Sequence, residues 1–199
     1  MDERDERRLA ALRELARGCT DCPLYADATQ TVFGAGRIGA RLMLVGEQPG
    51  DREDRAGEPF VGPAGALLDA ALRVLGWPRD DLYVTNAVKH FKFEWRGKRR
   101  MHKTPAQREA AACLHWLEDE IALVRPAAAI ALGATAARSL AGRDVKVMKE
   151  RGQWIERTDG LRVLVTLHPS ALLRGEPAQR ESAFAAWVED LRRASPLLR

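Results

Sequence analysis

Short apolar runs alternate along this chain with longer segments in which apolar residues recur every three or four positions. The runs at 41–45, 82–85 and 126–133 are too short for helices and end at turn-forming residues, as buried strands do. Residues 153–157 and 161–167 form a further pair of expected strands. Strands that alternate with helices predict an α/β fold in three layers, with a mostly parallel central sheet flanked by helices.

Helices are expected where apolar residues follow helical spacing or where capping signals stand. Pro63 and Gly76 are placed to begin and end the helix that follows the first strand. The segment 104–107 reads Thr-Pro-Ala-Gln, which has the form of a capping box and predicts a helix from there to about Val124. The expected helices are residues 3–17, 64–76, 104–124, 134–140 and 176–193.

Polar side chains follow the ends of three of the expected strands. Glu47, Gln48 and Asp51 lie on the turn after the first strand, and Asn86 and His168 stand at the ends of later ones. Open α/β sheets bind ligands outside the carboxyl ends of their strands. One such turn alone is equally well a solvated acidic loop, but its repetition at several strand ends favours a functional site.

Two residues near these strand ends have more than one interpretation. Phe60, in a loop rich in glycine and proline, either packs into the core or offers a platform for a planar ring. Asn86 either forms a turn or presents its side-chain amide, whose donor and acceptor can pair with the edge of a base. The residues alone leave both choices open.

Composition sets broad limits on the class of protein. With 199 residues and 46% hydrophobic content, the chain suits one globular domain over residues 1–199, or at most two small ones. We expect a cytoplasmic protein without a membrane partner, because no apolar run has membrane-spanning length and the first residues are too charged for a signal peptide. The formal net charge of +4 permits nucleic-acid binding without identifying it.

The three cysteines are an odd count, which suits a metal site or free thiols better than a disulfide framework. Cys19 and Cys22 have the C-x-x-C spacing that lets two thiolates face one metal or cluster, and Cys113 lies on the helix expected at 104–124. A pair of ordinary thiols is the plain alternative. The glycine pattern at residues 34–39 matches a dinucleotide fingerprint only in letters, because it precedes a strand instead of following one.

A basic segment interleaved with aromatic residues lies in the long connection at 87–103. Cations there suit phosphates and rings suit bases, so the segment favours binding to a nucleic-acid strand, with a solvated basic loop as the alternative. The candidate DNA contacts are Lys98, Arg99, Arg100 and Lys103.

Several motifs in this order resemble the iron–sulfur, family 4-like uracil-DNA glycosylases, and among them the UdgX branch. The resemblance runs from Cys19 to the last helix. Three features distinguish UdgX from ordinary members: Gln48 in place of alanine, His90 in place of a cluster cysteine, and an insertion that ends at His102. The motifs are residues 46–51, 59–65, 85–90, 98–102 and 168–170.

This resemblance implies excision of uracil from DNA, followed by covalent attachment of the protein to the abasic sugar through His102. Uracil-containing DNA, with a preference for single strands, would be the substrate of a monomer, and uracil the product. Phe60 would stack on the base, Asn86 would read its edge, and His168 would bind the uracil O2. Glu47 would stabilise the sugar cation.

The same resemblance implies that Gln48 and Asp51 hold the loop and water positions around this centre. It also implies a [4Fe–4S] cluster on Cys19, Cys22, His90 and Cys113.

Alternatives remain open for both halves of the site. Three cysteines and one histidine also suit zinc. His115 is a rival fourth ligand, although positions i and i+2 on a helix diverge. A conventional turnover glycosylase and a non-enzymatic metal-containing nucleic-acid-binding module are the other two functional interpretations.

Overall fold

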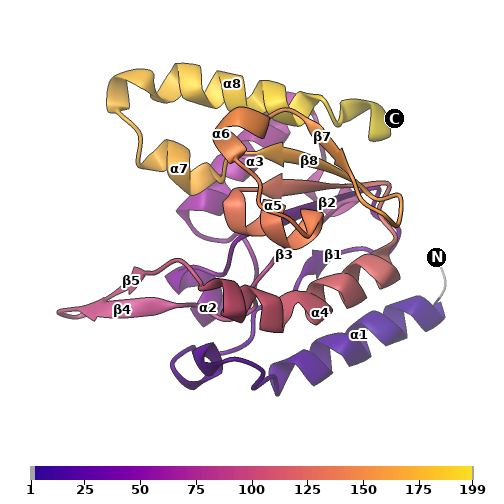
Figure 1. Cartoon of the computed structure of the whole chain (residues 1–199), viewed down its shortest axis with the longest axis vertical. Helices are drawn as coiled ribbons and strands as arrows, with labels where there is room; N and C mark the ends of the chain where they lie inside the picture. Colours follow the sequence, from indigo (N-terminus) through magenta and orange to yellow (C-terminus); the bar gives the residue numbers. More distant parts are fainter. Residues whose placement is uncertain (1–2, 199) are drawn as a thin grey trace.

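The computed structural model describes residues 3–198, which form a sheet between two layers of helices (Figure 1). The sheet is six-stranded within these residues, in the order β1-β3-β2-β6-β8-β7. β2, β3, β6 and β8 are parallel, while β1 and β7 pair antiparallel at the edges, so the expected mostly parallel α/β fold is confirmed. Its strands are β1 (Ala35–Gly36), β2 (Leu42–Gly46), β3 (Leu82–Asn86), β6 (Ala128–Leu132), β7 (Trp154–Glu156) and β8 (Arg162–Thr166).

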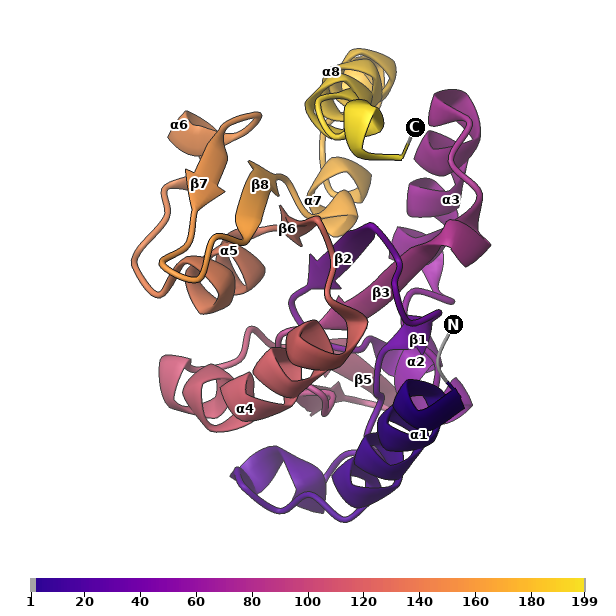
Figure 2. The ribbon, with the colours of Figure 1, turned by 90° about the vertical axis from the view of Figure 1, so that its right-hand side faces the viewer.

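Helices cover both faces of this sheet, as the view turned by 90° shows (Figure 2). Side chains of β2 alternate between two cores: Met43 and Val45 face the layer of α1, α4 and α5, and Leu42 and Leu44 face the layer of α3, α7 and α8. Every residue of β2 is buried, which explains why the strand reads as a continuous apolar run. These helices are α1 (Glu3–Arg17), α3 (Pro63–Leu75), α4 (Gln107–Val124), α5 (Ala134–Ala141), α7 (Pro169–Leu173) and α8 (Arg180–Arg192).

Short elements complete the described chain. The helices α2 (Asp51–Ala56) and α6 (Val147–Glu150) were not expected, because neither is long enough to show a helical period. Short 3-10 helices occupy Pro23–Ala26, Arg79–Asp81, Pro177–Gln179 and Ser195–Leu197. No helix among residues 3–198 is long and apolar enough to cross a membrane.

The structure corrects two helix starts. The helix expected from Thr104 begins at Gln107 instead, with Ala106 as its N-cap, and its Glu109 side chain accepts a hydrogen bond from the Ala106 N–H. Thr104 therefore does not form the capping box. The last helix begins at Arg180 and not at Glu176, because the intervening residues form a 3-10 helix.

The connection at 87–103, expected as one long loop, contains a β-hairpin. β4 (Phe93–Arg96) pairs antiparallel with β5 (Arg99–His102) as a separate two-stranded sheet among the described residues. Gly97, with φ of 59°, takes the left-handed conformation that a tight hairpin turn requires. In Figure 1 the hairpin extends past the rest of the chain at the left.

Candidate active site

Four parallel strands deliver polar side chains to one edge of the sheet. Glu47 follows β2, Asn86 ends β3, Thr135 lies just beyond β6, and His168 lies two residues beyond β8. This is the carboxyl edge, where open α/β sheets place ligands. His102 reaches the same place from a different direction, because it ends the second strand of the hairpin and lies beside Glu47.

Glu47 is held from two sides. Its Oε2 accepts a hydrogen bond of 2.7 Å from the Thr135 hydroxyl, and its Oε1 lies 3.3 Å from His102 Nε2. Burial alone would raise the pKa of Glu47, but the hydrogen bonds from His102 and Thr135 outweigh it and hold that pKa below its ordinary value. The side chain is therefore a carboxylate at neutral pH and faces the histidine as an anion.

His168 has a defined tautomer. The Ser170 N–H donates to its Nδ1 at 3.2 Å, and the Ser170 hydroxyl lies 2.8 Å from the same atom. Because Nδ1 accepts, a neutral ring carries its proton on Nε2, which is left as a donor. Burial lowers the pKa of His168 to about 4, against the opposing charge of Glu47. The ring is thus a neutral hydrogen-bond donor at physiological pH.

Phe60 and Asn86 meet over the glycine that ends β2. A Cβ at Gly46 would overlap both the Phe60 ring and Asn86 Oδ1, so the missing side chain creates the space beneath them. Asn86 is 2% exposed, and its Oδ1 is buried without a hydrogen-bond partner from any described residue. A buried acceptor of this kind costs free energy unless a ligand donates to it. The Phe60 and His168 rings lie 6.0 Å apart.

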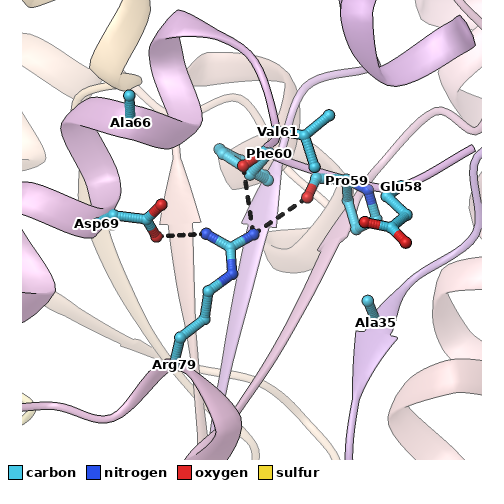
Figure 3. A pocket seen from close by; sticks show the side chains of 8 residues that line it. All are labelled: Ala35, Glu58, Pro59, Phe60, Val61, Ala66, Asp69 and Arg79. Carbon is cyan, nitrogen blue, oxygen red and sulfur yellow. Dashed lines mark hydrogen bonds and ion pairs between the residues drawn. The ribbon is translucent and has the colours of Figure 1, made fainter. Parts of the chain in front are cut away.

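The backbone of Phe60 is held in an unusual conformation, with φ of 56° in the left-handed region. Arg79 stabilises it, because one guanidinium nitrogen donates to the carbonyls of Pro59 and Phe60 at 3.1 and 3.3 Å, and the other donates to Asp69 at 2.5 Å (Figure 3). Gly65 allows the helix to approach, since a Cβ there would overlap the Phe60 carbonyl. These contacts fix the backbone that carries the ring, and Phe60 and Arg79 also line a cavity of about 400 Å³.

Gln48 secures the base of the hairpin. Its amide nitrogen donates to the carbonyls of Lys92 and Lys103 at 3.1 and 3.0 Å, and its Oε1 accepts from the Lys92 N–H at 3.0 Å. The amide is therefore engaged with main-chain groups on both sides of the hairpin. The resemblance implied that Gln48 holds loop and water positions around the centre, and in the structure its amide supports the segment that carries His102.

Arg100 also differs from its predicted place. The guanidinium donates to Asp51 Oδ1 at 2.5 Å and to Asp54 Oδ2 at 2.6 Å, and it lies over the rings of Phe91 and Phe93. The side chain is only 6% exposed, so it anchors the hairpin to α2 and does not point at DNA. Its position in a basic run suggested a DNA contact, but two carboxylates of α2 pair with it. Asp51, which was expected to hold loop and water positions around the centre, binds Arg100.

The other predicted DNA contacts lie on the outside of the hairpin. Lys98 and Arg99 are exposed, and neither forms an ion pair within residues 3–198. Lys103 pairs with Glu94 at 2.9 Å and remains about half exposed. These three side chains remain accessible to a polyanion.

Comparison with known proteins matches the sequence of this chain to one family. The model of the "Uracil DNA glycosylase superfamily" matches residues 33–192. The chain belongs to the uracil-DNA glycosylase superfamily. It is 36% identical over 195 residues to the type-4 uracil-DNA glycosylase of Thermotoga maritima, covering 98% of this chain and 96% of the relative. It is 38% identical over 179 residues to the type-4 uracil-DNA glycosylase of Pyrobaculum aerophilum, covering 86% of this chain and 87% of the relative.

The four predicted metal ligands of this superfamily member are all buried. The Cys19 and Cys113 sulfurs each accept a hydrogen bond, from Trp116 Nε1 at 3.2 Å and from the Lys89 N–H at 3.3 Å. Burial raises the pKa of all three thiols, that of Cys113 to about 11. Such thiols ionise only with help from a metal or strong donors.

His90 has one ring nitrogen with a partner and one without. Its Nε2 lies 2.9 Å from the Thr31 hydroxyl, while its Nδ1 is buried and has no hydrogen-bond partner among residues 3–198. A ligating histidine has one nitrogen oriented by a neighbour and the other free for the metal. The rival His115 is instead half exposed and pairs with Asp21 at 2.8 Å, which favours His90.

The donor set of three cysteines and one histidine suits a four-iron cluster or a single zinc ion. In the described part of the chain, no three His, Cys, Asp or Glu side chains converge closely enough to hold one metal ion. A tetrahedral zinc site draws its thiolates to about 2.3 Å from one ion, whereas the ligands of a four-iron cluster bind different irons and lie farther apart.

A buried ion pair joins the thiol region to the strand ends, and sequence reasoning missed it. Lys89 Nζ lies 2.5 Å from Glu120 Oε2 and donates to the Asn86 carbonyl at 2.8 Å, and both charged side chains are fully buried. Through its N–H the same lysine contacts Cys113. Thr135 was also missed, although a hydroxyl just past a strand end was a visible signal.

Proposed function

We propose that this chain is a uracil-DNA glycosylase that removes uracil from DNA and then stays covalently bound to the abasic sugar through His102. Membership of the superfamily and the names of its relatives support the excision. The covalent step rests on one observation: His102 Nε2 lies 3.3 Å from Glu47 Oε1, at the strand ends, where a turnover enzyme would need a water molecule. Single-stranded DNA suits this site, because no base pair has to open before the uridine flips out.

Recognition of uracil would rest on Phe60 and Asn86. The Phe60 ring provides a face for stacking, and the unpartnered Asn86 Oδ1 is placed to accept a hydrogen bond from uracil N3–H. Its amide nitrogen would donate to O4. Cytosine presents the opposite pattern of donors and acceptors, so it would leave buried groups unpaired and bind poorly.

Cleavage of the glycosidic bond would use His168 and Glu47. As the bond between C1′ and N1 breaks, its electron pair leaves with uracil, and the neutral His168 ring donates from Nε2 to the developing charge on O2. The Glu47 carboxylate stabilises the positive charge that builds up on the sugar, as carboxylates do in glycoside hydrolysis.

Capture of the sugar would use His102. Transfer of the Nε2 proton to Glu47 frees the imidazole lone pair, which then forms a bond to C1′. The proton on Glu47 balances the charge of the departing uracil anion, which takes it up. The resulting bond joins an imidazole nitrogen to the sugar, and imidazole is a poor leaving group once it is alkylated, so hydrolysis has no easy route.

Cys19, Cys22, Cys113 and His90 would hold a [4Fe–4S] cluster in this protein. The buried thiols with N–H donors, and the free Nδ1 of His90, support this set. When bound, the cluster would tie the segment around Cys19 to the segment after β3 and so brace the loop next to Asn86.

The cluster assignment predicts a brown protein with broad absorbance from iron–thiolate charge transfer. Cys113→Ala should lose this absorbance together with most of the iron. His115→Ala is the matched control and should keep both, because that side chain pairs with Asp21 outside the ligand set. Colourless wild-type protein that carries stoichiometric zinc by metal analysis would refute the assignment.

The low pKa of His168 predicts an unusual pH profile for excision. Because this ring stays neutral down to about pH 4, and because Glu47 is ionised above its lowered pKa, neither group titrates near neutrality. Single-turnover uracil release by the wild-type protein at saturating DNA should therefore stay flat from about pH 5.5 to about pH 8. A rate that rises with a midpoint near the ordinary histidine value of 6.5 would contradict the role given to His168.

A denaturing gel tests the proposed function directly. The protein is incubated with a labelled single-stranded oligonucleotide that contains one uracil, and the products are separated in SDS. We expect a slow band that survives denaturation and requires uracil. Free abasic DNA without this band would mean ordinary turnover, and unchanged DNA would mean that the chain does not excise uracil.

A further inference from the structure

Trp95 is the most exposed aromatic side chain of the hairpin, with 64% of its surface accessible. A single exposed aromatic needs no explanation by itself, but three features set this one apart. It shares a face with His102, its position is fixed by packing, and the same hairpin carries the exposed cations Lys98 and Arg99.

The strand register places Trp95 beside His102. Trp95 pairs with Arg100 and Phe93 pairs with His102, so these four side chains lie on one face of the hairpin. Trp95 and His102 are diagonal neighbours on that face, with Cβ atoms roughly 7 Å apart. The repeat of a nucleic-acid backbone spans a similar length, so a strand held with C1′ at His102 passes its next nucleotide close to Trp95.

Packing holds the indole in place. Its ring meets Phe93 edge to face at a centroid distance of 5.5 Å, and Phe93 stacks on Phe91 at 5.2 Å. The Arg100 guanidinium covers Phe93 at 5.0 Å and joins the hairpin to α2 through its two carboxylate contacts. One edge of the indole is therefore fixed while much of its surface stays in solvent, as a stacking platform requires.

The charges around Trp95 suit a polyanion. Lys98 and Arg99 follow in the turn and in the facing strand, and both are exposed. Cations that track phosphates beside an aromatic face are the usual arrangement for binding a single strand. A protein partner would not account for the position of the indole next to His102.

We propose that Trp95 stacks on the base of the nucleotide adjacent to the flipped uridine and so holds the DNA strand in register with His102. This inference rests on the proposed function for the identity of the strand. It assigns to Trp95 a contact separate from the uracil pocket, which is formed by Phe60 and Asn86.

Stacking is tested by Trp95→Ala and Trp95→Phe on single-stranded oligonucleotides with one uracil. We expect Trp95→Ala to raise the DNA concentration for half-maximal adduct about tenfold, with the rate at saturating DNA unchanged. Trp95→Phe should restore most of the affinity. Met148→Ala is the control, because Met148 is 73% exposed on α6, and it should change nothing.

Removal of the neighbouring base isolates the contact. A tetrahydrofuran abasic analogue is placed immediately 5′ of the uracil in one oligonucleotide and immediately 3′ in another. When the analogue replaces the nucleotide that stacks on Trp95, wild type and Trp95→Ala should have equal affinity for the DNA. Quenching of 2-aminopurine at that position should depend on Trp95. An unchanged half-maximal concentration in Trp95→Ala, or a tenfold loss that persists with abasic analogues on both sides, would overturn the proposal.

Failure of the proposed function can be distinguished from failure of the stacking proposal. If the wild type forms no adduct, anisotropy with the same oligonucleotides replaces the gel as the readout. The dependence on Trp95 and on the neighbouring base then still decides the stacking proposal.

Discussion

His102→Ser should abolish the denaturant-resistant adduct and convert the protein into a glycosylase that releases abasic DNA. Serine lacks a nitrogen nucleophile and leaves space for water at C1′, while Glu47 keeps its hydrogen bond from Thr135. The contacts of Phe60, Asn86 and His168 do not involve His102 in the proposed complex. We therefore expect no detectable adduct, together with multiple turnovers of uracil release, measured by gel and by free uracil.

A second substitution checks this prediction. Adding Glu47→Gln to His102→Ser should lower the remaining uracil release by about 100-fold or more, because a neutral amide stabilises the sugar cation poorly. Lys98→Ser is the matched control on the same hairpin. It should weaken DNA binding but leave adduct formation at saturating DNA unchanged. Adduct that persists in the His102→Ser protein would refute the mechanism.

Asn86→Asp should lower uracil excision by about 100-fold or more. The change replaces the amide donor, which faces uracil O4 in the proposed complex, with a carboxylate oxygen that would repel it. Single-turnover excision at saturating DNA measures the effect. Affinity for a strand without uracil should remain close to that of the wild type, since the proposed phosphate contacts lie on the hairpin. Uracil excision at the wild-type rate would remove Asn86 from base recognition.

Thermal denaturation separates this effect from misfolding. Asn86 contributes its main-chain carbonyl to Lys89, and that contact does not depend on the side chain. The variant should therefore melt as a folded protein.

The strand ends could be predicted from the sequence because they depend on local signals. A short apolar run such as 41–45 is recognisable as a strand, and the residue after it is fixed at the edge of the sheet. Glu47, Asn86 and His168 were identified in this way, and the structure brings them together at one edge. Their chemical roles stay predictions until the experiments above are done.

Tertiary contacts could not be predicted in the same way. Arg100 belongs to a basic run in the sequence, and only the fold brings it to Asp51 and Asp54 on α2. The left-handed conformation of Phe60 depends on Arg79, which lies 19 residues further along the chain. No local pattern contains that information, because each contact joins segments that are distant in sequence.

The hairpin shows why the basic segment was misread as a loop. Its alternation is short, and the face that carries Phe93 and Trp95 also carries Arg100, which sequence reasoning counts as polar. The approach of His102 to Glu47 follows from this hairpin and from the support of Gln48. The resemblance to UdgX indicated His102, but its distance from Glu47 required the structure.

Mass spectrometry of the digested adduct tests covalent capture most directly. Wild-type protein is reacted with uracil-containing DNA, then treated with nuclease and trypsin, and the peptides are sequenced by fragmentation. The account predicts that the mass of the abasic sugar is attached to His102 and that the uracil base is absent. Attachment at a nearby lysine such as Lys98 or Lys103, or a digest with no modified peptide, would contradict it.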